Sequence, residues 1–199
     1  MKCCQVAIVV LATIAAVPAW AEERLPAISP SGYTEEQRRA ASEFEAARKV
    51  PVFGPFEVMM HSPQLMSTAR AMGDYLRYKS AIGNTLSELV ILMTARAWRQ
   101  DYEWSIHYPM ALKAGIRKEV ADGIGAGRRP ASMNSEEQTV FDFTSELLLK
   151  KGVSDATFAR AKARLGMKGV VDITGIVGYY TLLAMQLNVA RYPADRQTK

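Results

Sequence analysis

The sequence predicts an all-α protein, a compact domain of about seven or eight helices, on the strength of two observations. Apolar residues recur with a helical period along most of the chain, in stretches that begin near Thr, Ser, Asn or Asp and end near Gly or Pro. No segment shows convincing period-2 alternation with turns between, which is the pattern of β-strands. We therefore expect helices throughout.

The first 21 residues have the features of a secretory signal peptide. Lys2 gives a positive start, residues 6–17 form an apolar run, and Ala19 and Ala21 supply small residues at the cleavage positions. The run is too short for a permanent membrane anchor. We expect cleavage after Ala21, a periplasmic or secreted protein, and no membrane insertion of the mature chain.

Both cysteines of the sequence, Cys3 and Cys4, lie in this leader and precede its apolar run, which does not suit lipoprotein attachment. The mature chain is therefore expected to have no disulfide, no thiolate nucleophile and no Cys-ligated metal. Its 24 basic and 20 acidic residues form no dense Lys/Arg block, so we expect no nucleic-acid binding.

After cleavage about 178 of the 199 residues remain, enough for one domain with a sizeable core. Residues 22–33 contain two prolines and a glycine and are expected to form an arm or linker. One helical domain is expected over residues 34–192, and a tail over residues 193–199.

The first half of this domain contains four predicted helices. Thr34 caps a helix that ends before Val50-Pro51, and Ser62 with Pro63 begins a second that runs to about residue 79. His61, at that junction, is expected to be a loop or capping residue. A third helix opens at residues 84–85 and runs to about residue 100; a fourth spans residues 101–115, with a bend expected at its internal proline.

The second half continues with a short helix from Arg117 into a glycine-rich loop, in which the sequence GIGAG follows no strand and so does not predict nucleotide binding. Asn134 caps the next helix, to about residue 150, and Ser154 begins another short one. The last helix is expected to run from Gly169 or Val170 to Ala190. It is apolar enough for burial or for an oligomer interface.

Three ionisable residues make a candidate proton-handling site. Glu88 lies in residues 86–97, a segment that is apolar nearly all the way round a helix and is therefore predicted to be buried. A charged carboxylate is unexpected in a buried helix, so a functional role is a possible explanation for it. Glu103 and His107 are spaced i, i+4 and share one helix face. They are candidates for acid/base catalysis, and a purely structural pair is the alternative. No metal is predicted, because two histidines far apart in sequence do not have metal-ligand spacing.

Three segments, SELVILMTARAW, EWSIHYPMALKAG and GIVGYYTLLAMQLN, resemble the carboxymuconolactone decarboxylase family, which includes the alkyl hydroperoxidase D type proteins. The resemblance covers roughly residues 53–190. It implies an all-helical fold of the alkyl hydroperoxidase D type and assembly as a homo-oligomer, whether dimer, trimer or hexamer.

The hydroperoxidase branch of this family carries a CxxCxxxH motif and a glutamate that relays protons. By resemblance Glu88 matches that glutamate and His107 the histidine, but Gln100 and Glu103 occupy the cysteine positions. Peroxide reduction by that route needs one thiolate to attack and a second thiol to resolve, so we expect no thiol peroxidase activity.

The decarboxylase branch, which needs no cysteine, implies the roles of the site residues. His107 would be the proton donor, Glu103 its orienting partner, and Glu88 a buried carboxylate with a raised pKa. Arg96 is the expected anchor for a substrate carboxylate, or else an ion-pair partner of Glu88 or Asp172.

Several aromatic residues are candidates for the pocket wall. Trp104 is the aromatic residue we expect to contact substrate, with Trp98 and Phe56 as further candidates, although aromatics at helical spacing are usually core residues. For the same reason, Tyr179 and Tyr180 are expected to pack in the core.

The resemblance therefore implies a cofactor-free enzyme that decarboxylates, or otherwise processes, a small carboxylate or lactone. An exported protein would not meet the cytoplasmic intermediate that gives the family its name, so a different small acid is expected. The alternative is a non-catalytic helical oligomer that binds a small ligand or a partner protein between the same helices.

Overall fold

The computed structural model describes residues 22–196 and confirms the all-α class: these residues form eight α-helices and one short 3-10 helix, with no strand. The predicted signal peptide lies outside the described residues. The elements are η1 (Pro30–Gly32), α1 (Glu35–Arg48), α2 (Pro55–Met59), α3 (Pro63–Tyr78), α4 (Gly83–Ala97), α5 (Asp101–Lys113), α6 (Lys118–Gly125), α7 (Ser135–Lys150) and α8 (Asp155–Ala190).

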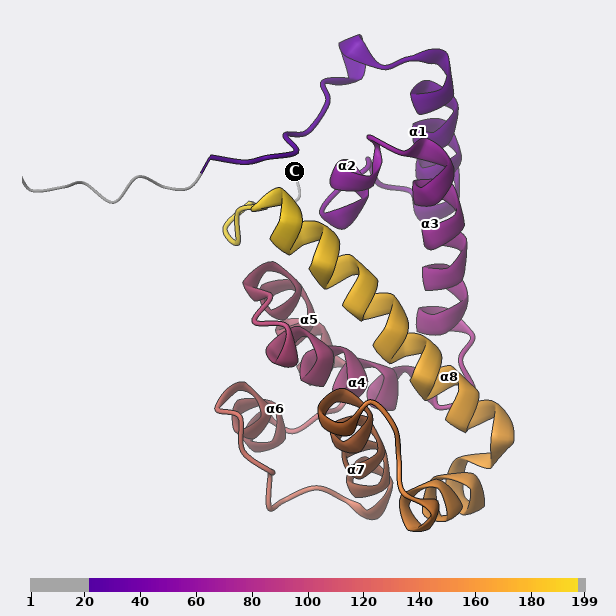
Figure 1. Ribbon diagram of the computed structural model, residues 1–199, viewed down its shortest axis with the longest axis vertical. Coiled ribbons are helices and arrows are strands. Elements are labelled where there is room, and N and C mark those ends of the chain that lie inside the picture. Colours follow the sequence, from indigo (N-terminus) through magenta and orange to yellow (C-terminus); the bar gives the residue numbers. More distant parts are fainter. Residues whose placement is uncertain (1–21, 197–199) are drawn as a thin grey trace, which may run out of the picture.

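The helix α4 is the centre of the fold. Residues 86–95 are all buried, as the all-round apolar pattern of this segment predicts. The helices α3, α5, α6, α7 and α8 all contact it (Figure 1). Every face of α4 is therefore covered by another helix, and any polar side chain on it must find its partner inside the protein.

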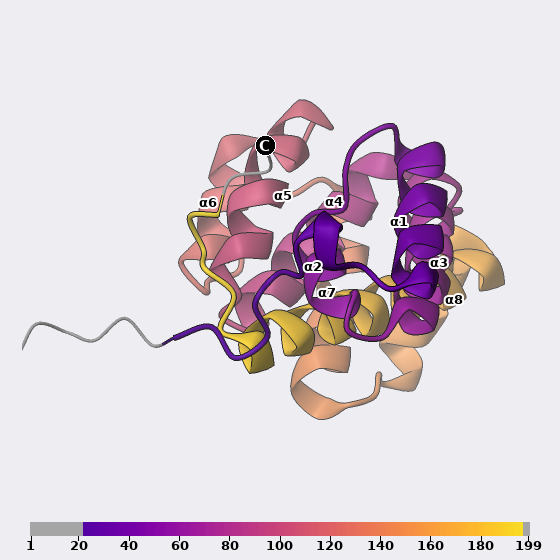
Figure 2. The same cartoon turned by 90° about the horizontal axis from the view of Figure 1, so that it is seen from above.

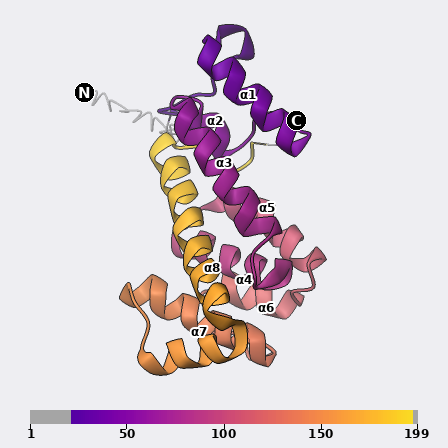
Figure 3. The ribbon, with the colours of Figure 1, turned by 90° about the vertical axis from the view of Figure 1, so that its right-hand side faces the viewer.

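The helix α8 joins the two ends of the molecule. It contacts α2, α3, α4 and α7, and it runs between α1 and α2 at one end and α7 at the other (Figures 1 and 3). The two C-terminal helices expected from sequence are continuous apart from a kink at Gly166, where φ is 69° and ψ is 175°. Glycine tolerates this conformation, so the chain bends there instead of forming a loop.

By length and composition alone, α8 could also cross a membrane, and it is the one helix in the described part of the chain that meets this test. In its most apolar window 56% of the residues are buried inside the protein. The core helix of a water-soluble protein passes the same test, so the pattern is accounted for by packing against α2, α3, α4 and α7.

The helix caps agree closely with the sequence pattern. Thr34 and Asn134 both form capping boxes, with Gln37 and Glu137 respectively reaching back to the cap backbone. Ser62 stands at the N-cap of α3 but makes no side-chain cap hydrogen bond there. The chain between the first two helices expected from sequence contains the short helix α2.

The N-terminal arm runs beside the C-terminal end of α8 (Figure 2). The backbone N–H of Arg24 donates to the carbonyl of Ala190 at 2.8 Å, and Nε2 of His61 lies 3.1 Å from the carbonyl of Pro26. Leu25 packs against a small apolar cluster that includes Tyr102. The arm thus covers part of the domain surface next to α2 and the end of α8.

A close approach of α3 to α8 generates a stability prediction. A Cβ added at Gly73 would lie 2.3 Å from the hydroxyl oxygen of Tyr179, whereas one added at Gly178 would meet no atom of the described chain within 4 Å. We expect Gly73→Ala to lower the free energy of unfolding by about 1–3 kcal/mol through overpacking. Gly178→Ala, the matched control, is expected to raise it by about 0.5–1 kcal/mol. Urea unfolding of both variants measures the difference, and equal effects would contradict the close contact.

Candidate active site

The structure brings together the three ionisable residues singled out from the sequence. Glu88 comes from α4, and Glu103 and His107 from successive turns of α5; their exposed fractions are 1%, 3% and 3%. Nδ1 of His107 lies 2.8 Å from Oε2 of Glu88, and Nε2 lies 3.5 Å from Oε2 of Glu103. One buried imidazole therefore stands between two carboxylates.

The two contacts of His107 differ in kind. The 2.8 Å contact with Glu88 is a hydrogen bond, in which a carboxylate can only accept, so Nδ1 carries the proton and donates. The 3.5 Å contact with Glu103 is too long for a good hydrogen bond. In the neutral imidazole Nε2 is then the acceptor, and it faces the carboxyl group of Glu103. The hydrogen bond to Glu88 therefore fixes the orientation of the imidazole ring, whereas the longer contact between Nε2 and Glu103 constrains the two groups less.

Arg77, at the C-terminal end of α3, completes the group. Its Nη2 lies 3.5 Å from Oε1 of Glu88 and 3.6 Å from the sulfur of Met110. Its Nε has no hydrogen-bond partner among residues 22–196. The sequence does not single out Arg77, because a basic residue in the last turn of a helix is usually explained by the helix dipole. Its position beside Glu88 depends on how α3 packs on α4.

Burial raises the pKa of Glu103 above its ordinary value. The charge of Arg77, and that of His107 when its ring is protonated, act in the opposite direction, and the negative charge of Glu88 adds to the effect of burial. Glu103 therefore keeps its proton to a higher pH than an exposed glutamate does. A carboxyl group with a raised pKa beside an imidazole acceptor is suited to donate a proton.

The group borders a cavity of about 790 Å³. His107, Glu103 and Arg77 line it, whereas Glu88 lies behind His107. The segment between α1 and α2 forms another wall, with the C-terminal part of α8 and the residues after it. The remaining lining residues are Arg48, Val50, Pro51, Val52, Phe53, Pro55, Phe56, Glu57, Tyr102, Ile106, Met110, Tyr179, Tyr180, Leu183, Tyr192 and Arg196.

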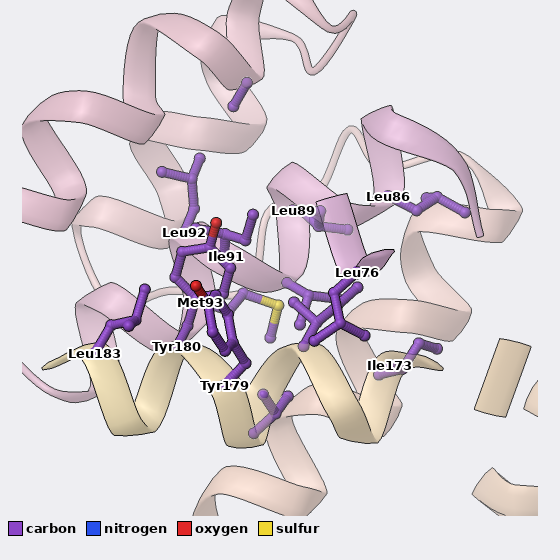
Figure 4. Packing of buried hydrophobic residues seen from close by; sticks show 14 of the residues in the cluster. Leu76, Leu86, Leu89, Ile91, Leu92, Met93, Ile173, Tyr179, Tyr180 and Leu183 are labelled. Atoms are coloured by element: carbon purple, nitrogen blue, oxygen red, sulfur yellow. The ribbon is translucent and has the colours of Figure 1, made fainter. Parts of the chain in front are cut away.

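Tyr179 and Tyr180 are buried core residues, as the sequence pattern predicts, and both also line the cavity. They project from α8 into the core that it shares with α4 (Figure 4). The ring of Tyr180 meets the imidazole of His107 edge to face, with centroids 5.1 Å apart. Burial raises the pKa of Tyr180 well above its ordinary value, so its hydroxyl stays protonated.

Arg96 and Trp104 lie elsewhere, which corrects their expected place in the substrate pocket. Both line a separate cavity of about 420 Å³ near Gly125, whose carbonyl accepts a 2.7 Å hydrogen bond from Nε of Arg96. The reason is helical geometry: Arg96 stands eight residues after Glu88, about 12 Å further along the axis.

The expected ion-pair partners of Arg96 are engaged by other groups. Glu88 is held by His107 and Arg77, and Asp172 accepts hydrogen bonds from the backbone of Ala81 and the hydroxyl of Tyr75, at 2.7 and 3.1 Å. The guanidinium group that lies beside Glu88 and lines the cavity with His107 is that of Arg77.

The two positions that match the family's cysteines have different surroundings. Gln100 caps α5, accepting a 2.8 Å hydrogen bond from the backbone of Tyr102, and its amide donates to Asn188 at 2.9 Å. Glu103, in contrast, lines the cavity beside His107. Within residues 22–196 no group of three or more His, Cys, Asp or Glu side chains is arranged to hold a metal ion.

Comparison with known proteins agrees with this geometry. The family model described as "Carboxymuconolactone decarboxylase family" matches residues 63–146, which include Arg77, Glu88, Glu103 and His107. Residues 63–146, which hold these four side chains, are therefore similar to the carboxymuconolactone decarboxylase family. No curated protein sequence matches it.

Two crystal structures share the fold of this chain. One is an uncharacterized peroxidase-related protein from Silicibacter sp. TM1040, with 12% identity, a TM-score of 0.69, and coverage of 84% of this chain and 88% of that one. The other, from Ralstonia eutropha JMP134, is described as an alkylhydroperoxidase AhpD core and an uncharacterized peroxidase-related protein. It has 16% identity and a TM-score of 0.71, and the match covers 86% of this chain and 91% of that one.

The raised pKa of Glu103 generates a prediction about stability and pH. The folded state holds this proton more tightly than the unfolded state, so the stability that Glu103 contributes is full below about pH 4.5 and is lost as pH rises through the raised pKa. We expect Glu103→Gln to unfold at an equal or higher temperature than wild type near neutral pH. The difference should shrink toward about pH 4.5.

Glu88→Gln is the contrasting variant, because it leaves Arg77 without its carboxylate partner and is expected to cost about 1–3 kcal/mol. Thermal unfolding across this pH range measures both variants. A fall in the melting temperature of Glu103→Gln as large as that of Glu88→Gln would show that Glu103 is a structural ion-pair residue.

Proposed function

We propose that the protein is a cofactor-free acid/base enzyme that decarboxylates, or processes as a lactone, a small carboxylated substrate. The observation that supports this most directly is the buried imidazole of His107 between Glu88 and Glu103 at the wall of a cavity. Burying three ionisable groups is costly in free energy. A role in proton transfer is a reason for the protein to keep them buried at this position.

The geometry suggests a different division of roles from the one implied by the family resemblance. Glu88, hydrogen-bonded to Nδ1, orients His107, and Arg77 balances the charge of Glu88. Glu103 lines the cavity and has the raised pKa, so we assign the transferred proton to Glu103 and His107 together. Glu88 is then a positioning residue.

The proposed step conserves atoms and electrons without an added cofactor. The bond between the substrate's carboxylate carbon and its neighbour breaks, CO2 leaves, and the electron pair passes into an extended enolate. A proton from the Glu103–His107 pair then adds to carbon. Arg77 supplies positive charge near the reacting group, and the apolar walls formed by Phe53 and Phe56 favour the loss of charge in this step.

Thiol peroxidase activity is disfavoured on chemical grounds. Residues 22–199 contain no cysteine, and Gln100 and Glu103 stand where the hydroperoxidase motif places its two thiols. Neither an amide nor a carboxylate can attack a peroxide and form a disulfide. The structural relatives described as peroxidase-related share the fold at less than 25% identity and so do not imply this activity.

The setting of the enzyme is also proposed. The predicted leader would export it, so its substrate would be a small acid of the periplasm or the surroundings. The outer face of α8 carries exposed Met167, Val171, Met185 and Val189, which is consistent with assembly as a homo-oligomer.

The proposed acid/base roles can be tested with the mature protein and a panel of carboxylated lactones and keto acids, by following CO2 release. We expect His107→Gln and Glu103→Gln to lower the rate by about 10²–10⁴-fold, the usual contribution of general acid/base catalysis. Glu137→Gln is the matched control, because Glu137 is equally buried but lies in the capping box of α7.

Saturable binding without product across the panel would instead support a non-catalytic binding protein. If the control variant loses as much activity as the site variants, the effect comes from buried charge in general and not from this site.

A pH profile gives an independent check. If Glu103 donates the proton, activity is high while it is protonated and falls as pH rises through its raised pKa. We expect this alkaline limb to lie above the ordinary pKa of glutamate and to be absent from the residual activity of Glu103→Gln. An unchanged limb in that variant would assign the titration to another group.

A further inference from the structure

The chain after the predicted leader contains no cysteine, so its sulfur chemistry is that of methionine. Nine of the ten methionines lie after residue 21, since only Met1 belongs to the leader. Five of the nine are buried, and the exposed ones are Met72, Met110, Met167 and Met185. Of these four, only Met110 lines the cavity beside His107.

Met110 lies at the edge of the proton-handling group. It stands on α5, three residues after His107 and seven after Glu103, and all three line the cavity. Residues with these spacings share one face of a helix. Because 37% of the Met110 side chain and backbone surface is exposed, a small molecule dissolved in water can reach it. Its sulfur is therefore not sealed in the core.

Arg77 is the polar neighbour of this sulfur, and it is poorly supplied with hydrogen-bond acceptors. Its Nη2 lies 3.6 Å from Sδ of Met110 and 3.5 Å from Oε1 of Glu88. Both contacts are weak, because a thioether sulfur is a weak acceptor and 3.5 Å is long for an N–H···O hydrogen bond. The buried Nε of Arg77 has no partner among residues 22–196. The guanidinium group can therefore gain from a better acceptor placed next to it.

We propose that Met110 is an oxidation site that regulates the candidate active site, through a sulfoxide oxygen that accepts a hydrogen bond from Arg77. The oxidant is a peroxide. A lone pair on Sδ attacks one peroxide oxygen, an S–O bond forms and the O–O bond breaks. With hydrogen peroxide, the departing hydroxide takes the proton of the transferred oxygen, so the products are the sulfoxide and water. Sulfur loses two electrons and the peroxide gains them.

The new oxygen changes what holds Arg77. A hydrogen bond from a charged guanidinium group to an oxygen is shorter and stronger than one to a thioether sulfur. The sulfoxide therefore draws Arg77 away from Glu88, where the present contact is only 3.5 Å. Glu88 keeps its hydrogen bond to His107 but loses its cation. The regulatory effect rests on the proposed function, in which Arg77 balances the charge of Glu88, whereas the oxidation itself does not.

Peptide mapping by mass spectrometry during treatment of the mature protein with hydrogen peroxide tests whether this sulfur reacts. We expect Met110 to be oxidised on the same time scale as Met72 and Met185, whose exposed fractions are 45% and 40%. Met66, which is 0% exposed, should remain reduced. A Met110 that stays reduced together with Met66 would overturn the proposal.

The Nε–H signal of Arg77 in the NMR spectrum of an isotope-labelled sample reports on the guanidinium group directly. This N–H is buried, and its signal is identified by its loss in Arg77→Lys. Peroxide should shift the signal in wild type and leave it in place in Met110→Leu, which cannot form a sulfoxide at this position. Met185→Leu, the matched control, removes another exposed methionine and should respond as wild type does.

A signal that moves equally in Met110→Leu, or that stays in place in wild type after Met110 is oxidised, would show that the sulfoxide does not engage Arg77.

The rate of CO2 release from the substrate panel connects this site to the proposed function. Peroxide treatment should lower the rate of wild type about tenfold, the effect of disturbing one hydrogen bond to a charged group, and methionine sulfoxide reductases should restore it. In Met110→Leu the rates before and after treatment should be equal. In Met185→Leu the rate should fall as in wild type.

The two proposals can fail separately. If the Arg77 signal shifts on oxidation but no compound releases CO2, the contact between the sulfoxide and Arg77 stands and the decarboxylase proposal falls. If CO2 release is found but does not change when Met110 is oxidised, the decarboxylase proposal stands and the regulatory role of Met110 falls.

Discussion

The structure depends on one buried hydrogen bond, from Nδ1 of His107 to Oε2 of Glu88, which joins α4 to α5. Both side chains are almost fully shielded from water. An unpaired charge in such a buried place would be costly. The carboxylate is therefore held on two sides, by the imidazole and by Arg77 of α3. The helices α3, α4 and α5 meet at this point. Their packing brings the three polar side chains together, and the contacts among these side chains in turn join the helices.

The fold was largely predictable from the sequence, because local chemistry sets the helix limits. Thr34 and Asn134 form the capping boxes that their sequences indicate, and the all-round apolar pattern of residues 86–97 correctly predicts a buried helix. At the C-terminus the sequence predicted two helices, the second beginning at Gly169 or Val170, whereas the structure has one helix with a kink at Gly166. The helical pattern continues on both sides of Gly166, and only the backbone conformation of this residue marks the break.

The site was predictable only in part, and the reason is the distance over which its contacts form. Glu103 and His107 are neighbours on one helix face, so their spacing in sequence is enough to pair them. Arg77 comes from another helix and carries no local signal of its role. Arg96 was expected in the wrong cavity because it lies about two turns of helix from Glu88 and so has different surroundings. The apolar pattern of the helix does not show this difference.

The division of the cavity between two parts of the chain has a consequence for how such proteins diversify. Substitutions in the loop before α2, or near the end of α8, change the surface offered to a ligand without touching the contact between α4 and α5. Such substitutions can thus change which molecule binds in the cavity while the buried contact between His107 and Glu88 stays intact. Proteins with this scaffold but different ligands would then differ most in the loop before α2 and near the end of α8, and least around the imidazole of His107.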